Sequence, residues 1–134
     1  AGVYSLEQVQ LFTKNHQLSG GKSSLSDYYT ADYGAVSLDK SLRKRVVFSD
    51  HSLVTDAAFG EMQFVSCRNV LIYFERPLQD RAIGLFADSL SRKGFLGIGA
   101  KESIRFSSHS EQFDDFVREE RIYQKRRERH DAAM

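Results

Sequence analysis

The chain has 134 residues, of which 41% are hydrophobic and 28% are charged, and its formal net charge is +1 at pH 7. This size and composition suit one globular domain with its own core, and the small net charge excludes a global field that would attract nucleic acid or an anionic membrane. One cysteine excludes an internal disulfide, and no apolar run approaches the ~20 residues that cross a bilayer, so we expect a cytoplasmic protein without membrane insertion.

The N-terminal segment predicts a capped helix followed by a β-ribbon. Ser5 and Gln8 have the spacing of a capping box, so a helix is expected from there to about Lys14. Tyr28, Tyr29 and Tyr33 before Gly34 and Val36 after it predict a small β-hairpin, which we place at about residues 26–38 as an inserted β-subdomain.

The following segment predicts a short helix and a short strand. Ser37 is expected to cap the helix, because a serine side chain can accept a hydrogen bond from the free N–H groups of a first helical turn. Residues 46–48 read Val-Val-Phe, and we expect them to form a strand of the sheet.

The second half of the chain predicts a strand–helix–strand unit and a terminal strand pair. The expected elements are a strand at 64–67, a helix that begins at Pro77 and is stopped by Gly94, a strand at 95–99, and antiparallel strands at 113–118 and 121–126. A strand, a helix and a strand in this order form a right-handed crossover of a parallel sheet. The terminal pair then supplies an antiparallel edge. The predicted fold class is α/β, doubly wound.

Two polar residues, Arg68 and Asn69, interrupt an apolar run that continues to Phe74. If the strand ends at Cys67, both residues stand at the carboxyl end of a parallel strand, which is where open α/β sheets bind their ligands. The alternative is a core strand whose arginine snorkels or pairs with a neighbour. Composition alone favours this second interpretation.

A series of segments around this interruption carries a family resemblance. Residues 67–74 read C-R-N-V-L-I-Y-F, and a Pro-started helix, a K-G-F-L strand and a G-x-x-E-S turn follow. This series resembles the C-terminal half of CheR-type chemoreceptor methyltransferases. Further family-like segments lie in the same order at residues 2–7, 42–48 and 122–126. The resemblance therefore covers residues 1–126 as the C-terminal part of the methyltransferase domain, and residues 127–134 form a charged tail.

The resemblance implies a Rossmann-like fold, S-adenosyl-L-methionine as cofactor, and transfer of its methyl group to glutamate side chains of receptor proteins. It places Arg68 and Asn69 in contact with the cofactor and Tyr73 beside the transferring methyl group, with Arg68 and Tyr73 as the catalytic pair. Ser52 and Leu53 fall where the family binds the cofactor's adenine. A glutamate carboxylate is already ionised at pH 7 and needs no general base, so the site has to position it and balance its charge.

Three departures from the family pattern bear on this interpretation. The glycine-rich cofactor motif and the acidic residue that follows it are absent from the sequence, Ser52 stands where asparagine is common, and the turn at residues 99–102 keeps only its glycine and glutamate. The chain also begins at Ala1 rather than at a methionine. We therefore expect a piece of a longer protein, inactive alone, whose sheet lacks its first strands.

The missing strands have a structural consequence and leave a functional alternative open. Without them the strand at 64–67 becomes an exposed edge, so we expect self-association through this edge. A non-catalytic, degenerate module that binds a receptor or a partner protein is the alternative function.

Several other residues carry weaker signals. Cys67 is expected to be a buried thiol rather than a reactive one, and the four histidines are too far apart in the sequence to predict a metal site. The basic run at 125–130 contains Glu128, and we expect a solvated tail rather than a nucleic-acid patch. The tyrosines at positions 28, 29 and 33 either pack the ribbon or contact a partner by strand addition, and the sequence does not decide between the two.

Overall fold

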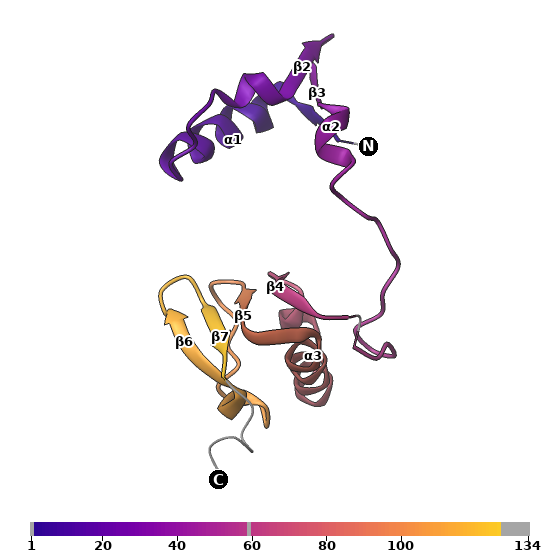
Figure 1. Cartoon of the computed structure of the whole chain (residues 1–134), viewed down its shortest axis with the longest axis vertical. Coiled ribbons are helices and arrows are strands. Elements are labelled where there is room, and N and C mark those ends of the chain that lie inside the picture. The colour runs from indigo at the N-terminus through magenta and orange to yellow at the C-terminus, as the bar shows by residue number, and fades with distance from the viewer. Residues whose placement is uncertain (1, 59, 127–134) are drawn as a thin grey trace. The chain divides into compact units, whose positions relative to one another are not determined.

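The structure, a computed structural model, describes residues 2–58 and 60–126. The chain splits into two compact units, Ala1–Asp50 and His51–Met134, and Figure 1 labels their helices and strands. Within the described ranges there is no helix with the length and apolar content needed to cross a membrane. The predicted charged tail lies outside the described residues, and one continuous domain over residues 1–126 stays a prediction.

The first unit combines one longer helix with a small antiparallel sheet. It contains β1 (Val3–Ser5), α1 (Leu6–Leu18), the 3-10 turn η1 (Leu25–Tyr28), β2 (Tyr29–Asp32), β3 (Ala35–Leu38) and α2 (Lys40–Arg43). The strand order is β1-β3-β2, and both pairs are antiparallel. The predicted hairpin is confirmed by β2 and β3, and β1 adds a third strand that the sequence did not predict. That the hairpin forms a separate inserted subdomain stays a prediction.

The start of α1 forms as the sequence predicts. The Ser5 side chain accepts a hydrogen bond from the backbone N–H of Gln8 at 3.3 Å, and the Ser5 backbone N–H donates to Gln8 Oε1 at 3.1 Å. The reciprocal pair satisfies two N–H groups that the first helical turn leaves without a partner. The helix continues to Leu18, beyond the expected end near Lys14.

Two expectations for residues 37–48 are wrong. Ser37 lies inside β3, and α2 begins after Asp39 instead. Residues 46–48 form no strand, and Val47 is 91% exposed and Phe48 84% exposed. A strand exists only where a neighbouring strand pairs with its backbone groups. None of the described residues supplies a neighbour for this segment.

The second unit holds a mixed four-stranded sheet with one helix against it (Figure 1). Its elements are β4 (Met62–Cys67), η2 (Leu71–Tyr73), α3 (Arg76–Ser89), β5 (Leu90–Ile98), η3 (Ser110–Gln112), β6 (Phe113–Val117) and β7 (Ile122–Lys125). The strand order is β4-β5-β7-β6, with β4 parallel to β5 and the other pairs antiparallel. The parallel crossover pair and the antiparallel terminal pair are therefore confirmed.

The helix α3 begins as predicted, with Pro77 in its first turn, but it ends at Ser89. The expectation that Gly94 stops the helix is wrong, because Gly94 lies inside β5. The side chain of Lys125 on β7 donates instead to the carbonyl oxygens of Ala87 and Leu90 at the helix end. A cation at this position satisfies carbonyl groups that the last helical turn leaves free.

The core of this unit lies between α3 and one face of the sheet. Ile83 and Phe86 of α3 and Leu96 and Ile98 of β5 are almost completely buried. Each such side chain contributes about 1.5–3 kcal/mol by leaving water. The cluster also contains Val65, Cys67, Leu71, Ala82, Ala87, Leu90, Ile104, Phe113 and Tyr123.

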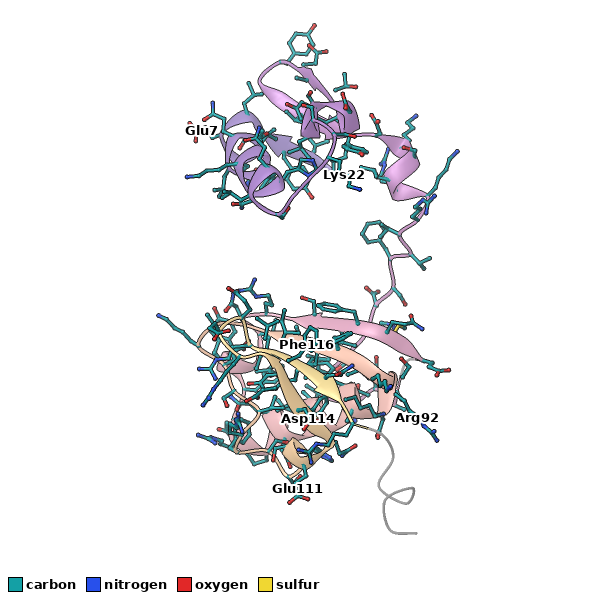
Figure 2. All side chains as sticks on the ribbon, turned by 60° about the vertical axis from the view of Figure 1, so that its left-hand side comes forward. Glu7, Lys22, Arg92, Glu111, Asp114 and Phe116 are labelled. Carbon is teal, nitrogen blue, oxygen red and sulfur yellow. The ribbon has the colours of Figure 1, made fainter. Side chains whose placement is uncertain are left out.

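The opposite face of the sheet carries exposed aromatic side chains and has no helix of its own unit, among the described residues, packed on it. Phe64 on β4 is 53% exposed and Phe116 on β6, labelled in Figure 2, is 58% exposed. The Phe116 ring contacts that of Phe95 with centroids 4.6 Å apart, and Phe64 lies over Gly97. A doubly wound sheet has helices on both faces, so the second helical layer stays a prediction.

Candidate functional site

Arg68 and Asn69 follow directly on the end of β4. The strand ends at Cys67, as the ligand-binding interpretation requires, and both following residues are exposed. The alternative of a core strand with a snorkelling arginine is therefore wrong. The Arg68 side chain forms no hydrogen bond or ion pair within the described part of the chain. Its guanidinium is available to a ligand at the carboxyl end of a parallel strand.

A buried carboxylate joins this loop to the end of β5. Glu102 is 4% exposed, and its Oε1 accepts hydrogen bonds from the backbone N–H of Asn69 at 2.9 Å and of Gly99 at 2.7 Å. Its Oε2 accepts from the backbone N–H of Ile72 at 3.1 Å. Sequence reasoning missed this role. The available signal was a glutamate three residues after a glycine at a strand end, within the G-x-x-E-S turn.

Tyr73 stands at the end of the same loop. It closes the turn η2 and is 81% exposed, whereas Leu71 in the same turn is buried. Gln79 of α3 holds this turn, because its Nε2 donates to the carbonyl oxygens of Leu71 at 2.7 Å and Phe74 at 2.9 Å. The loop is thus anchored through its backbone carbonyls by hydrogen bonds from Gln79, while the Tyr73 side chain is exposed to solvent.

Ser52 and Leu53 lie in a tight turn of the same unit. The Ser52 backbone N–H donates to Asp56 Oδ2 at 2.7 Å, and the Ser52 hydroxyl accepts from the Val54 N–H at 3.2 Å. The Ser52 bond and, more weakly, His51 lower the pKa of Asp56. Leu53 packs against the core. Neither residue is hydrogen-bonded to the loop after β4 within the described ranges.

A pocket of about 220 Å³ adjoins the loop after β4. Two cations line it, and within the described residues neither Arg76 nor Lys101 forms an ion pair. The guanidinium of Arg76 lies over the ring of Phe106 at 4.3 Å from its centroid. The remaining lining residues are Leu71, Ile72, Gln79, Glu102 and Ser103. Unpaired cations at a pocket favour an anionic ligand such as a carboxylate.

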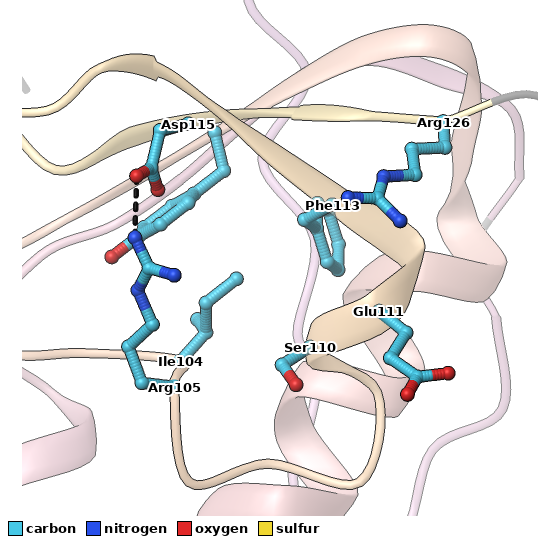
Figure 3. A pocket seen from close by; sticks show the side chains of 8 residues that line it. Ile104, Arg105, Ser110, Glu111, Phe113, Asp115 and Arg126 are labelled. Carbon is cyan, nitrogen blue, oxygen red and sulfur yellow. Dashed lines mark hydrogen bonds and ion pairs between the residues drawn. The ribbon is translucent and has the colours of Figure 1, made fainter.

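A second pocket, of about 260 Å³, is less suited to an anion (Figure 3). Its two arginines are already paired: Arg105 bonds to Asp115, and Arg126 Nε donates to Asp114 Oδ1 at 2.7 Å. Exposed pairs of this kind are weak, but they place a carboxylate beside each guanidinium. The candidate site therefore lies at the end of β4 and not here.

The tyrosines at positions 28 and 33 of the ribbon differ in their surroundings. Tyr28 packs edge-on against the ring of His16, with centroids 6.5 Å apart. Tyr33 forms the tip of the hairpin and is 99% exposed. Packing explains the first tyrosine, and contact of the second with a partner stays a prediction. Among the described residues no three His, Cys, Asp or Glu side chains come together as metal ligands would.

Cys67 is a buried thiol whose pKa is raised to about 11, mainly by burial and also by the negative charge of Glu102. A thiolate is the reactive form, so we expect iodoacetamide at pH 8 to leave Cys67 unmodified in the folded chain and to alkylate it in 6 M urea, as mass spectrometry would show. The unfolded thiol loses its proton near pH 9.0, below the raised pKa of the folded state. The protonated Cys67 thiol therefore contributes fully to the free energy of unfolding below pH 9.0, and this contribution declines above it. Rapid alkylation of the folded chain would contradict this account.

Known proteins resemble the chain along most of its length. The family described as CheR methyltransferase, SAM binding domain, matches residues 6–122. A Pseudomonas putida protein named methyltransferase Cher3 is 51% identical over 124 residues, which cover 92% of this chain and 45% of that protein. A chemotaxis protein methyltransferase of Listeria innocua is 45% identical over 62 residues, 46% of this chain and 24% of that protein. One of Vibrio anguillarum is 32% identical over 72 residues, 53% of this chain and 26% of that protein. The chain thus spans less than half the length of each of these relatives.

Proposed function

The chain belongs to the CheR methyltransferase family, in the domain that binds S-adenosylmethionine, and on this premise we propose that it forms part of a protein-glutamate O-methyltransferase. The acceptors are glutamate side chains of chemoreceptor-type signalling proteins, and the reaction takes place in the cytoplasm. The observation that carries the proposal is the position of Arg68 and Asn69, exposed at the carboxyl end of the parallel strand β4.

The residues at this end of the sheet fit part of S-adenosylmethionine. The guanidinium of Arg68, which has no partner among the described residues, suits the carboxylate of the cofactor's amino acid group, because it can hold a carboxylate by two parallel hydrogen bonds. The amide of Asn69 offers both a donor and an acceptor. Ser52 fits less well, because its hydroxyl oxygen already accepts a bond from the Val54 N–H. Leu53 supplies apolar surface beside it.

Bound S-adenosylmethionine supplies an activated methyl group. The acceptor carboxylate is ionised at neutral pH, so no side chain of this chain has to remove a proton. Arg68 and the hydroxyl of Tyr73 act by holding carboxylate groups in line and by balancing charge, which lowers the barrier without acid–base chemistry. This mechanism requires exposed, oriented polar groups after the end of β4.

The partner we propose is the cytoplasmic domain of a chemoreceptor or a similar acidic protein. The pocket beside the site supports an acidic acceptor, since the cations Arg76 and Lys101 line it without an ion pair in the described residues. The ribbon supports peptide capture, because β2 is an edge strand that pairs only with β3 among the described strands, and Tyr33 at its tip is exposed.

A non-catalytic module that only binds a receptor or partner is the second candidate. The engaged hydroxyl of Ser52 favours it, because a serine held in its own turn cannot replace an amide that reads adenine.

Calorimetry with S-adenosylhomocysteine separates the two candidates. We expect the full-length protein to bind this product with a micromolar dissociation constant, because Arg68 and Asn69 present the polar groups that its amino acid end requires. A binding-only module would give no heat at a hundredfold higher ligand concentration. That result would reject the enzymatic proposal.

A further inference from the structure

We propose that Glu102 is a positioning residue of the candidate site: its carboxylate sets the backbone of the loop after β4 and so the directions in which Arg68 and Asn69 leave the sheet. The inference rests on the proposed function for its catalytic consequence. Its structural part, the hold on the loop, stands independently.

Within the described residues, the hydrogen bonds of the Glu102 side chain all come from backbone N–H groups of the two loops that leave the parallel strands. Oε1 accepts from the backbone N–H of Asn69, after β4, at 2.9 Å and from that of Gly99, after β5, at 2.7 Å. Oε2 accepts from the backbone N–H of Ile72 at 3.1 Å. A carboxylate is costly to bury unless its oxygens are hydrogen-bonded. These bonds satisfy both oxygens, so the side chain is fixed between the loops.

The conformation of Asn69 shows what the carboxylate holds. Its φ is 62°, in the left-handed region that a residue other than glycine adopts when its surroundings maintain it. A Cβ atom on Gly99 would lie 2.3 Å from Asn69 Oδ1 and 2.8 Å from Glu102 Oε1. Only glycine therefore leaves room for the Asn69 amide and the Glu102 carboxylate to lie together over the end of β5.

The bonds fall beside the residues that the proposed function uses. Asn69 itself is one of them, Arg68 precedes it, and Ile72 precedes Tyr73. A change in the Asn69 backbone turns the whole loop, and small displacements of positioned groups reduce catalysis strongly. The contact of Glu102 with the site is indirect, through the loop backbone, so its effect falls on cofactor binding and turnover.

The test is Glu102→Gln in the full-length protein, with Glu119→Gln as the matched control in the exposed turn after β6. The glutamine keeps the size of the side chain, but when its carbonyl oxygen accepts the bonds from Asn69 and Gly99, its –NH2 group faces the Ile72 N–H and cannot accept that bond. At a temperature where both variants are fully folded by circular dichroism, we expect at least tenfold weaker binding of S-adenosylhomocysteine and at least tenfold lower kcat for Glu102→Gln. KM for the acceptor protein should change less than twofold, and the control should match the wild type.

Hydrogen exchange separates failure of this inference from failure of the proposed function. In Glu102→Gln we expect amide protection to fall at Asn69, Gly99 and Ile72 while the β5–β7 pairing keeps its protection. If the wild type binds no S-adenosylhomocysteine, the proposed function fails, and the exchange data alone decide whether Glu102 holds the loop. Unchanged protection, or unchanged affinity and kcat in a wild type that does bind, overturns the inference.

Discussion

Replacing Arg68 by alanine in the full-length protein is expected to lower kcat/KM for methyl transfer to a receptor glutamate by about 10²–10³-fold. Loss of one preorganised donor to a reacting or anchoring anion has an effect of this order. The change should not unfold the protein, because Arg68 is exposed and its side chain has no partner within the described residues. Kinetics with a tritiated methyl donor, at saturating and at limiting cofactor, would measure the loss and divide it between affinity and turnover.

Two further variants sharpen this test. Arg68→Lys keeps the charge but loses the fork that binds a carboxylate at two points, so we expect an intermediate loss. Arg118→Ala removes an exposed arginine in the turn after β6 and should leave kcat/KM at the wild-type value. Full activity of Arg68→Ala would show that the assigned role is wrong.

The isolated chain of 134 residues is expected to self-associate at micromolar concentration and to transfer no methyl groups. β4 is an edge strand that pairs only with β5 in the described residues, and its neighbouring sheet face exposes Phe64 and Phe116. Both phenylalanines are about half exposed, so each forfeits part of the roughly 1.5–3 kcal/mol that full burial contributes. A free strand edge favours pairing with another copy. Multi-angle light scattering measures the first effect and a methyl-transfer assay the second.

A matched pair of substitutions tests where the self-association arises. Phe64→Lys places a charge on the exposed edge and should shift the chain to a monomer. Leu18→Lys changes a 74% exposed leucine at the end of α1 and should leave the association unchanged. A stable wild-type monomer would refute the edge argument. Turnover by the isolated chain would refute the prediction that it is inactive alone.

Local signals in the sequence predicted the elements that local bonds create. The capping box of Ser5 and Gln8, the proline in the first turn of α3, and the alternating strand at 64–67 all have causes within a few residues. The end of β4 before Arg68 was one of two interpretations that the sequence left open, and composition alone favoured the other. The proline of α3 and the end of β4 belong to the unit that holds the proposed site residues.

Long-range contacts explain what the sequence could not predict. Val47 and Phe48 have the composition of a strand but no strand beside them in the described chain. The helix α3 ends at Ser89, before Gly94, and Lys125, which binds the Leu90 carbonyl at this helix end, lies 35 residues away from Leu90 in the sequence. The hydrogen-bonding role of Glu102 could not be predicted for the same reason, since its partner Asn69 is 33 residues away. Each depends on a neighbour that no periodic pattern identifies.

Transfer of a tritiated methyl group from S-adenosylmethionine to a receptor cytoplasmic domain by the full-length protein tests the central claim most directly. A glutamate methyl ester hydrolyses in mild base and releases volatile methanol, whereas methyl groups on nitrogen stay bound. The account predicts base-labile label on the receptor domain, absent when the acceptor glutamates are replaced by alanine. No transfer, or label that resists base, would contradict it.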